Sequence, residues 1–189
     1  MPTAMIYDKV LHKICGAEAL PGREFEGCIF RECDFTGARF SDFDFTECRF
    51  EKCRFGMAEF EETGMREAVF EECEVRGVDF GRCRKFGFSV AFRKCHLSFC
   101  SFHGLKMPKT AFTEGAAKEC FFSECDLTQA DFSGCDLERT LFDGCKLEKA
   151  DFRTAFQYTI DPAINRMRGA RFSRDGLEGL LASYGLSIE

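Results

Sequence analysis

The sequence contains no tryptophan, only three tyrosines and four prolines, and yet 24 phenylalanines. Aromatic residues recruited for recognition usually include tyrosine and tryptophan, because their polar groups can hydrogen-bond at a wet surface. A nearly pure phenylalanine set therefore indicates an apolar packing role. No stretch approaches the roughly 18 consecutive apolar residues of a membrane span, so we expect no contact with a membrane.

Positive charge is not in excess either. The chain has 26 Lys and Arg against 32 Asp and Glu, a formal net charge of −6, so we expect no direct nucleic-acid partner. The N-terminal residues show no basic segment followed by an apolar run, so we expect no secretory signal and a cytoplasmic location. Thirteen cysteines in such a protein argue against a disulfide framework.

Large apolar residues recur at every fifth position. Phenylalanine does so from Phe25 to Phe60, and the frame continues to Phe80. A second frame runs from Phe92 to Phe152 and is displaced by two residues, which predicts a two-residue insertion between Phe80 and Phe92. A period of five fits neither a helix nor a flat strand. It fits a coil with four short sides, in which the large residue and the small residue two positions earlier point inward.

A four-sided coil places residues 20 apart in one column, and two of the four columns consist of phenylalanine alone. The expected core columns are Phe30, Phe50, Phe70, Phe92, Phe112, Phe132, Phe152 and Phe172, and Phe40, Phe60, Phe80, Phe102, Phe122 and Phe142. A period of five alone would not create this difference between sides, so the columns favour the four-sided coil.

The repeated unit, a small residue followed two positions later by Phe or Leu, resembles the pentapeptide-repeat family. Cys33-Asp34-Phe35 and Ala130-Asp131-Phe132 are examples, and the resemblance covers roughly residues 18 to 172. It implies an all-β fold, a right-handed quadrilateral β-helix that forms a solenoid. We expect a single domain over 1–189, with an N-terminal cap (1–20), the β-helix (21–172) and a short C-terminal α-helix with a tail (173–189).

The C-terminal segment has the pattern of an amphipathic helix of about eleven residues, with Ser173 as its N-cap and Gly185 as its end. So short a helix is not stable alone, so it must pack on its own last coil or on a second copy. Both remain open, and we favour a homodimer, partly because related proteins dimerise this way. The expected dimer interface is Leu177, Leu180, Leu181, Tyr184, Leu186 and Ile188.

No pattern in the chain indicates catalysis. Cysteines five apart fall on adjacent sides of the coil rather than at the spacing of metal ligands, and we interpret them as small buried residues. There is no phosphate loop, nucleophile elbow or HExxH motif. We therefore expect a protein that is not an enzyme, with no catalytic residue, metal site or cofactor.

Charge is distributed unevenly along the chain. Residues 81–113 contain no acidic side chain, and this basic band comprises Arg82, Arg84, Lys85, Arg93, Lys94, Lys106 and Lys109. Acidic residues dominate before and after it. Candidate partner-binding acids are Asp42, Asp44, Glu61, Glu62, Glu71 and Glu72.

Two functional hypotheses follow. Some family members with a C-terminal helix resemble duplex DNA in width and charge, and bind DNA gyrase or topoisomerase IV in its place, which protects the enzyme from quinolones or toxins. The resemblance implies this function here, with the acids standing in for phosphates. The alternative is an interaction scaffold of unassigned partner that docks through the basic band 81–113.

Overall fold

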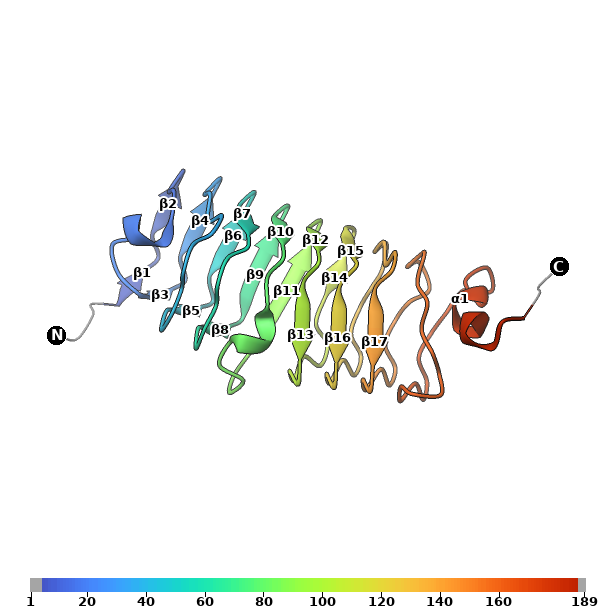
Figure 1. Cartoon of the computed structure of the whole chain (residues 1–189). Coiled ribbons are helices and arrows are strands. Elements are labelled where there is room, and N and C mark those ends of the chain that lie inside the picture. Colours follow the sequence, from blue (N-terminus) through green and yellow to red (C-terminus); the bar gives the residue numbers. More distant parts are fainter. Residues whose placement is uncertain (1–4, 187–189) are drawn as a thin grey trace.

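The computed structural model describes residues 5–186, which form a rod of stacked four-sided coils (Figure 1). All strand pairs in this part of the chain are parallel. Each coil passes through four walls in turn, so walls 1 and 3 are opposite each other, as are walls 2 and 4. The fold is the expected right-handed quadrilateral β-helix.

The walls have the following members. Wall 1 contains β1 (Ile6–Tyr7), β3 (Glu24–Glu26), β5 (Asp44–Thr46) and β8 (Gly64–Arg66), and continues through the bridged residues Lys106, Asp126, Lys146 and Arg166. Wall 2 contains β2 (Val10–His12), β4 (Ile29–Arg31), β6 (Arg49–Glu51), β9 (Ala68–Glu71), β11 (Val90–Arg93) and β14 (Phe112–Thr113). Wall 3 contains β7 (Arg54–Gly56), β10 (Glu74–Arg76), β12 (His96–Ser98) and β15 (Ala116–Lys118). Wall 4 contains the bridged pair Arg39 and Glu59, the 3-10 helix η2 (Phe80–Arg82), β13 (Ser101–His103), β16 (Phe121–Ser123) and β17 (Leu141–Asp143).

The strands are short because the chain turns a corner after every five residues. The corner residue often has a left-handed backbone, as at Lys52 (φ 54°) and Gln129 (φ 60°). Such a conformation costs roughly 1–2 kcal/mol for a residue with a side chain. It persists because the parallel hydrogen bonds and the stacked core fix the position of each corner.

The two phenylalanine columns form continuous ring stacks, as predicted. On wall 2, Phe50 lies 4.9 Å from Phe70 between ring centroids, with an interplanar angle of 20°. On wall 4, Phe102 lies 4.6 Å from Phe122 at 5°. The stacks meet edge to face across the interior, as between Phe112 and Phe122 (5.5 Å, 89°), and thereby fill it.

The small inward position has a second role besides filling space. Cys53 and Cys73 donate their thiols to the carbonyls of Phe30 and Phe50 in the preceding coil, each over 3.2 Å. The Thr63 hydroxyl makes the equivalent bond to Phe40 over 2.6 Å. The position therefore suits residues that are small and can donate a hydrogen bond, which explains why cysteine shares it with threonine.

The two-residue insertion lies in the loop 84–88. Strands on opposite sides of the insertion pair residues that are 22 apart in sequence, such as Phe70 and Phe92. Strands on the same side, from β3 onward, pair residues that are 20 apart, such as Phe50 and Phe70. Phe88 is buried and takes the core place that the sequence pattern leaves undefined, while Phe86 in the same loop is 94% exposed.

At the N-terminus, the segment expected as a cap continues the walls of the rod. Strands β1 and β2 pair with β3 and β4 and so belong to walls 1 and 2, with a shift of 19 residues between Leu11 and Phe30. The 3-10 helix η1 (Ala17–Ala19) follows, and Leu20 packs against the core.

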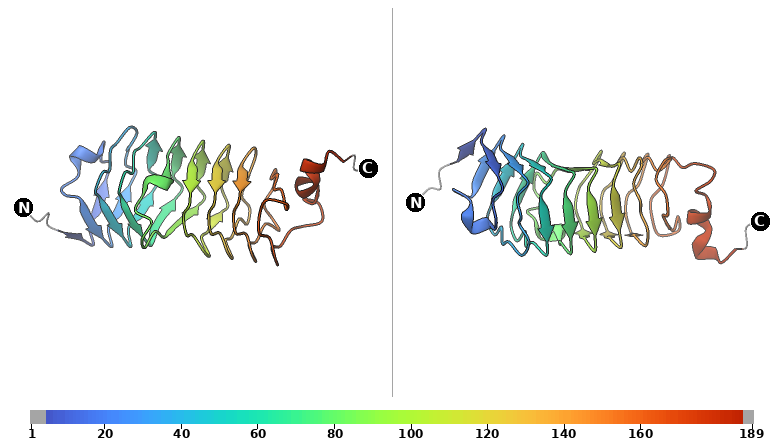
Figure 2. Two further views of the ribbon diagram at one scale, coloured as in Figure 1. Left: turned by 60° about the horizontal axis from the view of Figure 1, so that its bottom comes forward. Right: turned by 90° about the horizontal axis from the view of Figure 1, so that it is seen from above.

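The C-terminal helix is shorter than predicted. It comprises α1 (Glu178–Leu181), extended by the 3-10 helix η3 (Ala182–Tyr184), and lies at the end of the rod beyond the last coil (Figure 2). Ser173 does accept a hydrogen bond from the Gly176 backbone (3.2 Å), but within a turn that precedes the helix. Gly185 ends the segment in a left-handed conformation, as expected. None of the helices within 5–186 is long and apolar enough to cross a membrane.

Tyr158 explains where the C-terminal segment sits. Its buried ring packs on Phe152 and Phe172, at 6.1 and 5.5 Å between centroids. A Cβ atom at Gly176 or Gly179 would collide with Tyr158, so only glycine allows the segment to approach this closely. Burial raises the pKa of the Tyr158 hydroxyl.

Candidate interaction surfaces

The six acids predicted as a partner-binding surface lie on three walls. Asp42, Glu61 and Glu62 lie on wall 4 or on its corner, whereas Asp44 lies on wall 1 and Glu71 and the corner residue Glu72 on wall 2. The structure therefore brings together only half of the set.

Four of the six acids also have a basic partner, which lies in the neighbouring coil for three of them and two coils away for Asp44. Asp44 pairs with Arg84 at 2.9 Å, and Glu71 with Arg49 at 2.8 Å. Glu61 and Glu72 make ion pairs of the same kind, at 3.0 and 3.6 Å. These pairs reduce the charge that a partner would meet on walls 1 and 2 and, through Glu61, on wall 4.

Wall 4 nevertheless carries an acidic surface, of which only Asp42, Glu61 and Glu62 were predicted from the sequence. Its exposed acids, here called the wall 4 acids, are Asp42, Glu59, Glu61, Glu62, Asp79, Glu124 and Asp143. Against them stand Arg39 and Arg82, which pair with Glu59 (3.2 Å) and Glu61 (3.0 Å). A search at a period of 20 would have aligned Glu59 with Asp79, because residues 20 apart share a wall.

The basic band does not form one surface. Arg82 lies on wall 4, Arg84 and Lys85 lie in the loop, Arg93 and Lys94 lie on or beside wall 2, and Lys106 and Lys109 lie on wall 1. A segment of this length winds through more than one coil, so its side chains point in several directions. Arg82, Arg84 and Lys94 are also ion-paired with acids.

The loop 84–88 borders a groove of about 610 Å³ on wall 1. Its lining includes Lys85, Phe86 and Phe88 from the loop, and Lys106 and Pro108 from the next coil. A single exposed phenylalanine is normal on a protein surface, so Phe86 does not by itself indicate a partner.

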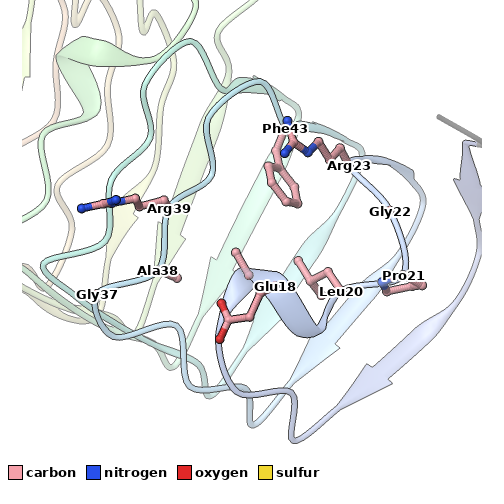
Figure 3. Close-up of a pocket in the computed structure, with 10 residues that line it drawn as sticks. Glu18, Leu20, Pro21, Gly22, Arg23, Gly37, Ala38, Arg39 and Phe43 are labelled. Atoms are coloured by element: carbon pink, nitrogen blue, oxygen red, sulfur yellow. The ribbon is translucent and has the colours of Figure 1, made fainter. Parts of the chain in front are cut away.

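A second groove, of about 670 Å³, lies near the N-terminus (Figure 3). Arg23 lies over the ring of Phe43, with its guanidinium carbon 5.6 Å from the ring centroid, and Glu18 and Arg39 lie elsewhere on the rim. The groove holds no cluster of nucleophile, base and orienting group that would indicate catalysis. Among the described residues, no group of three or more His, Cys, Asp and Glu side chains is placed to hold a metal ion.

The predicted dimer residues do gather around one hollow. It measures about 510 Å³ and is lined by Pro162, Leu177, Leu180, Leu181, Tyr184 and Leu186. Leu180 packs against the core of its own rod, whereas Leu177, Leu181, Tyr184 and Leu186 are exposed. Ile188 lies outside the described residues.

The cysteines differ in their exposure to solvent. Cys15 is exposed and the other twelve of the thirteen free cysteines are buried. Burial raises the pKa of the Cys48 and Cys135 thiols to about 12, so these groups stay protonated and unreactive at neutral pH.

Comparison with known proteins places the rod in a structural class. The full-length structure of QnrB1, a plasmid-mediated fluoroquinolone resistance protein, matches with a TM-score of 0.59 at 15% identity, over 97% of this chain and 100% of that one. A trypsin-treated variant of QnrB1 gives 0.57 at 17% identity, over 98% and 97%. At this identity the likeness shows the fold. No curated protein matches the chain in sequence.

The sequence itself identifies the family. The model of the pentapeptide repeat region matches residues 23–85 and 88–152, which together make up more than half of the chain. The break between the two matches falls in the loop that contains Phe86, where the structure places the insertion. This chain belongs to the pentapeptide-repeat family.

Proposed function

We propose that this protein binds DNA gyrase or topoisomerase IV in place of DNA, without catalysis of its own, and that the wall 4 acids form the contact surface. The observation that carries the proposal is the excess of acids on that wall, seven exposed acids against two arginines. A straight rod that presents carboxylates from successive coils, about 4.8 Å apart, can occupy a basic groove built for phosphates.

Two further observations support it. Asp42, Glu62, Glu124 and Asp143 have no ion-pair partner in the described part of the chain, so their charges are free to meet a partner. The fold also matches, along nearly its whole length, a protein described as conferring fluoroquinolone resistance. Docking through the basic band has less support, because the band is spread over several sides of the rod.

We further propose that the C-terminal hollow joins two copies into a homodimer. Four exposed apolar side chains around one hollow form a self-complementary patch at a rod end, and a two-fold contact there would bury them.

The unpaired thiols favour a reducing compartment, so we expect the protein in the cytoplasm.

The function is tested by titrating the protein into gyrase supercoiling and quinolone-induced cleavage assays. One variant carries Asp42→Asn, Glu62→Gln, Glu124→Gln and Asp143→Asn on wall 4. Its control carries Asp8→Asn, Glu47→Gln, Glu67→Gln and Glu74→Gln at exposed positions away from wall 4, with the same change in net charge. We expect wild type and control to affect gyrase and the wall 4 variant to lose the effect. No effect of wild type at tens of micromolar would refute the proposal.

The dimer is tested by analytical ultracentrifugation. Leu177→Asp with Leu181→Asp should give a monomer, because each places a charge in the apolar contact. Leu141→Asp, at a similarly exposed leucine on wall 4, should leave the mass unchanged. A wild-type monomer at high micromolar concentration would contradict the dimer.

A further inference from the structure

A group of six basic side chains on wall 1 comes together only in the folded rod. This wall 1 basic row consists of Lys106, Lys109, Lys146, Lys149, Arg166 and Arg168, and all six are exposed. Lys106, Lys146 and Arg166 belong to a single run of bridged residues along the rod, Lys106 to Asp126 to Lys146 to Arg166. Lys109 and Lys149 are corner residues of the same wall, and Arg168 directly follows Met167, which packs against the core.

Little negative charge opposes this row on its own wall. Asp126 and Glu148 are the acids there, and both are half-buried, unlike the cations. Asp126 is engaged by Lys146 at 3.3 Å and by the Thr128 backbone at 3.1 Å. One oxygen of Glu148 is buried in the rod and has no hydrogen-bond partner. Five of the six cations therefore have no ion-pair partner among residues 5–186.

We infer that the wall 1 basic row binds the sugar–phosphate backbone of double-stranded DNA. The three coil steps from Lys106 to Arg166 span about 14 Å at the spacing of parallel strands. Duplex DNA carries one phosphate charge per about 1.7 Å of axis, hence roughly eight phosphates over this length. The six cations can contact those of the phosphates that face the wall.

The side chains between the cations favour the DNA backbone over other partners. They are Pro108, Thr128, Gln129 and Gly169, and the only exposed aromatic ring beside the row in the described part of the chain is Phe86, at its Lys106 end, so an acidic protein would find no central apolar or aromatic anchor of the kind that protein interfaces use. A single strand would need aromatic platforms for its bases, and wall 1 has none in these coils. Phosphate contacts require only lysine, arginine and small polar donors.

The net charge of −6 does not oppose this assignment locally. At 0.1 M salt, exposed charges are screened beyond about 10 Å, so a bound duplex responds mainly to the wall it touches. The expectation of no nucleic-acid partner rested on the charge of the whole chain. Binding through one wall is independent of sequence and weak, with a dissociation constant of roughly 10⁻⁴–10⁻⁶ M. It is also independent of any contact with a topoisomerase through wall 4.

The test is fluorescence anisotropy of a short labelled DNA duplex of random sequence, measured over a series of KCl concentrations. The variant carries Lys106→Gln, Lys109→Gln, Lys146→Gln and Lys149→Gln. Gln129 already occupies the corner equivalent to Lys109 and Lys149 with the same backbone, so glutamine fits there. The control carries four substitutions at exposed positions on wall 3 or its corners, with the same charge change: Lys52→Gln, Arg54→Gln, Arg76→Gln and Arg139→Gln.

For wild type we expect log K to fall with log salt at a slope of about −3 to −5, given roughly −0.9 per phosphate contact. The wall 1 variant should lose most of this slope and at least tenfold in affinity at low salt, and the wall 3 variant should keep both. Thermal unfolding by circular dichroism checks that both variants fold. Absence of binding by wild type at low salt, or equal loss in both variants, would overturn the inference.

Two further arms separate DNA from other polyanions. A labelled single strand of equal length should bind more weakly than the duplex, and Phe86→Ala should leave duplex binding unchanged, because the exposed ring lies at the end of the row. If labelled polyglutamate binds more tightly than the duplex and Phe86→Ala weakens that binding, the surface serves an acidic protein and the DNA assignment is wrong.

Discussion

Replacing Phe102 by alanine tests the packing argument at its strongest point. Its ring stacks on Phe80 and Phe122 at 4.9 and 4.6 Å and meets Phe92 and Phe112 edge to face at 6.1 and 5.9 Å. The side chain is fully buried. Loss of a buried phenylalanine costs about 3–5 kcal/mol in the free energy of unfolding. Because coils contact only their neighbours, they cannot easily close over the cavity, so we expect the upper part of this range.

The assay is equilibrium unfolding in urea, with Phe99→Ala as the matched control. Phe99 is three positions away but half exposed, with Arg76 above its ring, so its loss should cost less than about 1 kcal/mol. If Phe102→Ala fails to fold, Phe102→Leu, which keeps an apolar side chain, should show an intermediate loss. Similar midpoints for Phe102→Ala and Phe99→Ala would refute the claim that the ring stacks hold the rod together.

Three further predictions concern single positions. A thiol reagent should modify Cys15 alone in the folded protein and all thirteen cysteines in denaturant, and rapid modification of more than one folded thiol would contradict the buried ladder. Gly115→Ala should destabilise the rod by about 1–3 kcal/mol in urea, because the new Cβ would lie within 2.8 Å of the Cys95 backbone nitrogen; an unchanged midpoint would show that this coil can shift. Hydrogen bonds from Arg153 at 2.7 and 2.9 Å lower the pKa of Asp151. The ionised carboxylate therefore stabilises the fold at pH values above its ordinary pKa of 3.8, and this stabilisation is lost as the pH falls through the lowered pKa. Asp151→Asn should therefore flatten the acid limb of stability against pH, and an unchanged limb would refute the linkage.

The core was predictable because a period of five and a column spacing of 20 are properties of the sequence itself. The stacks through Phe70 and Phe102 follow directly from that count, as does the insertion before Phe92. The choice of Phe88 to fill the remaining place did not follow, since the loop has two phenylalanines and only the backbone path decides which points inward. The C-terminal helix was predicted, but its shorter length was not, because the fit of Gly179 against Tyr158 depends on a contact between segments.

Surface charge was predicted less well, for a reason that applies to any solenoid. A window such as 81–113 winds past all four walls, so consecutive basic residues point in different directions, and Arg82 ends on the acidic wall. Lys106 and Arg166 are far apart in sequence but belong to the same bridged run on wall 1. Selection for a binding surface on such a rod acts at intervals of one coil, not on neighbouring residues. Charge in a pentapeptide-repeat chain should therefore be summed along each column, that is, over residues 20 apart. In this protein that sum separates an acidic wall 4 from a basic half of wall 1, and the net charge of the whole chain indicates neither.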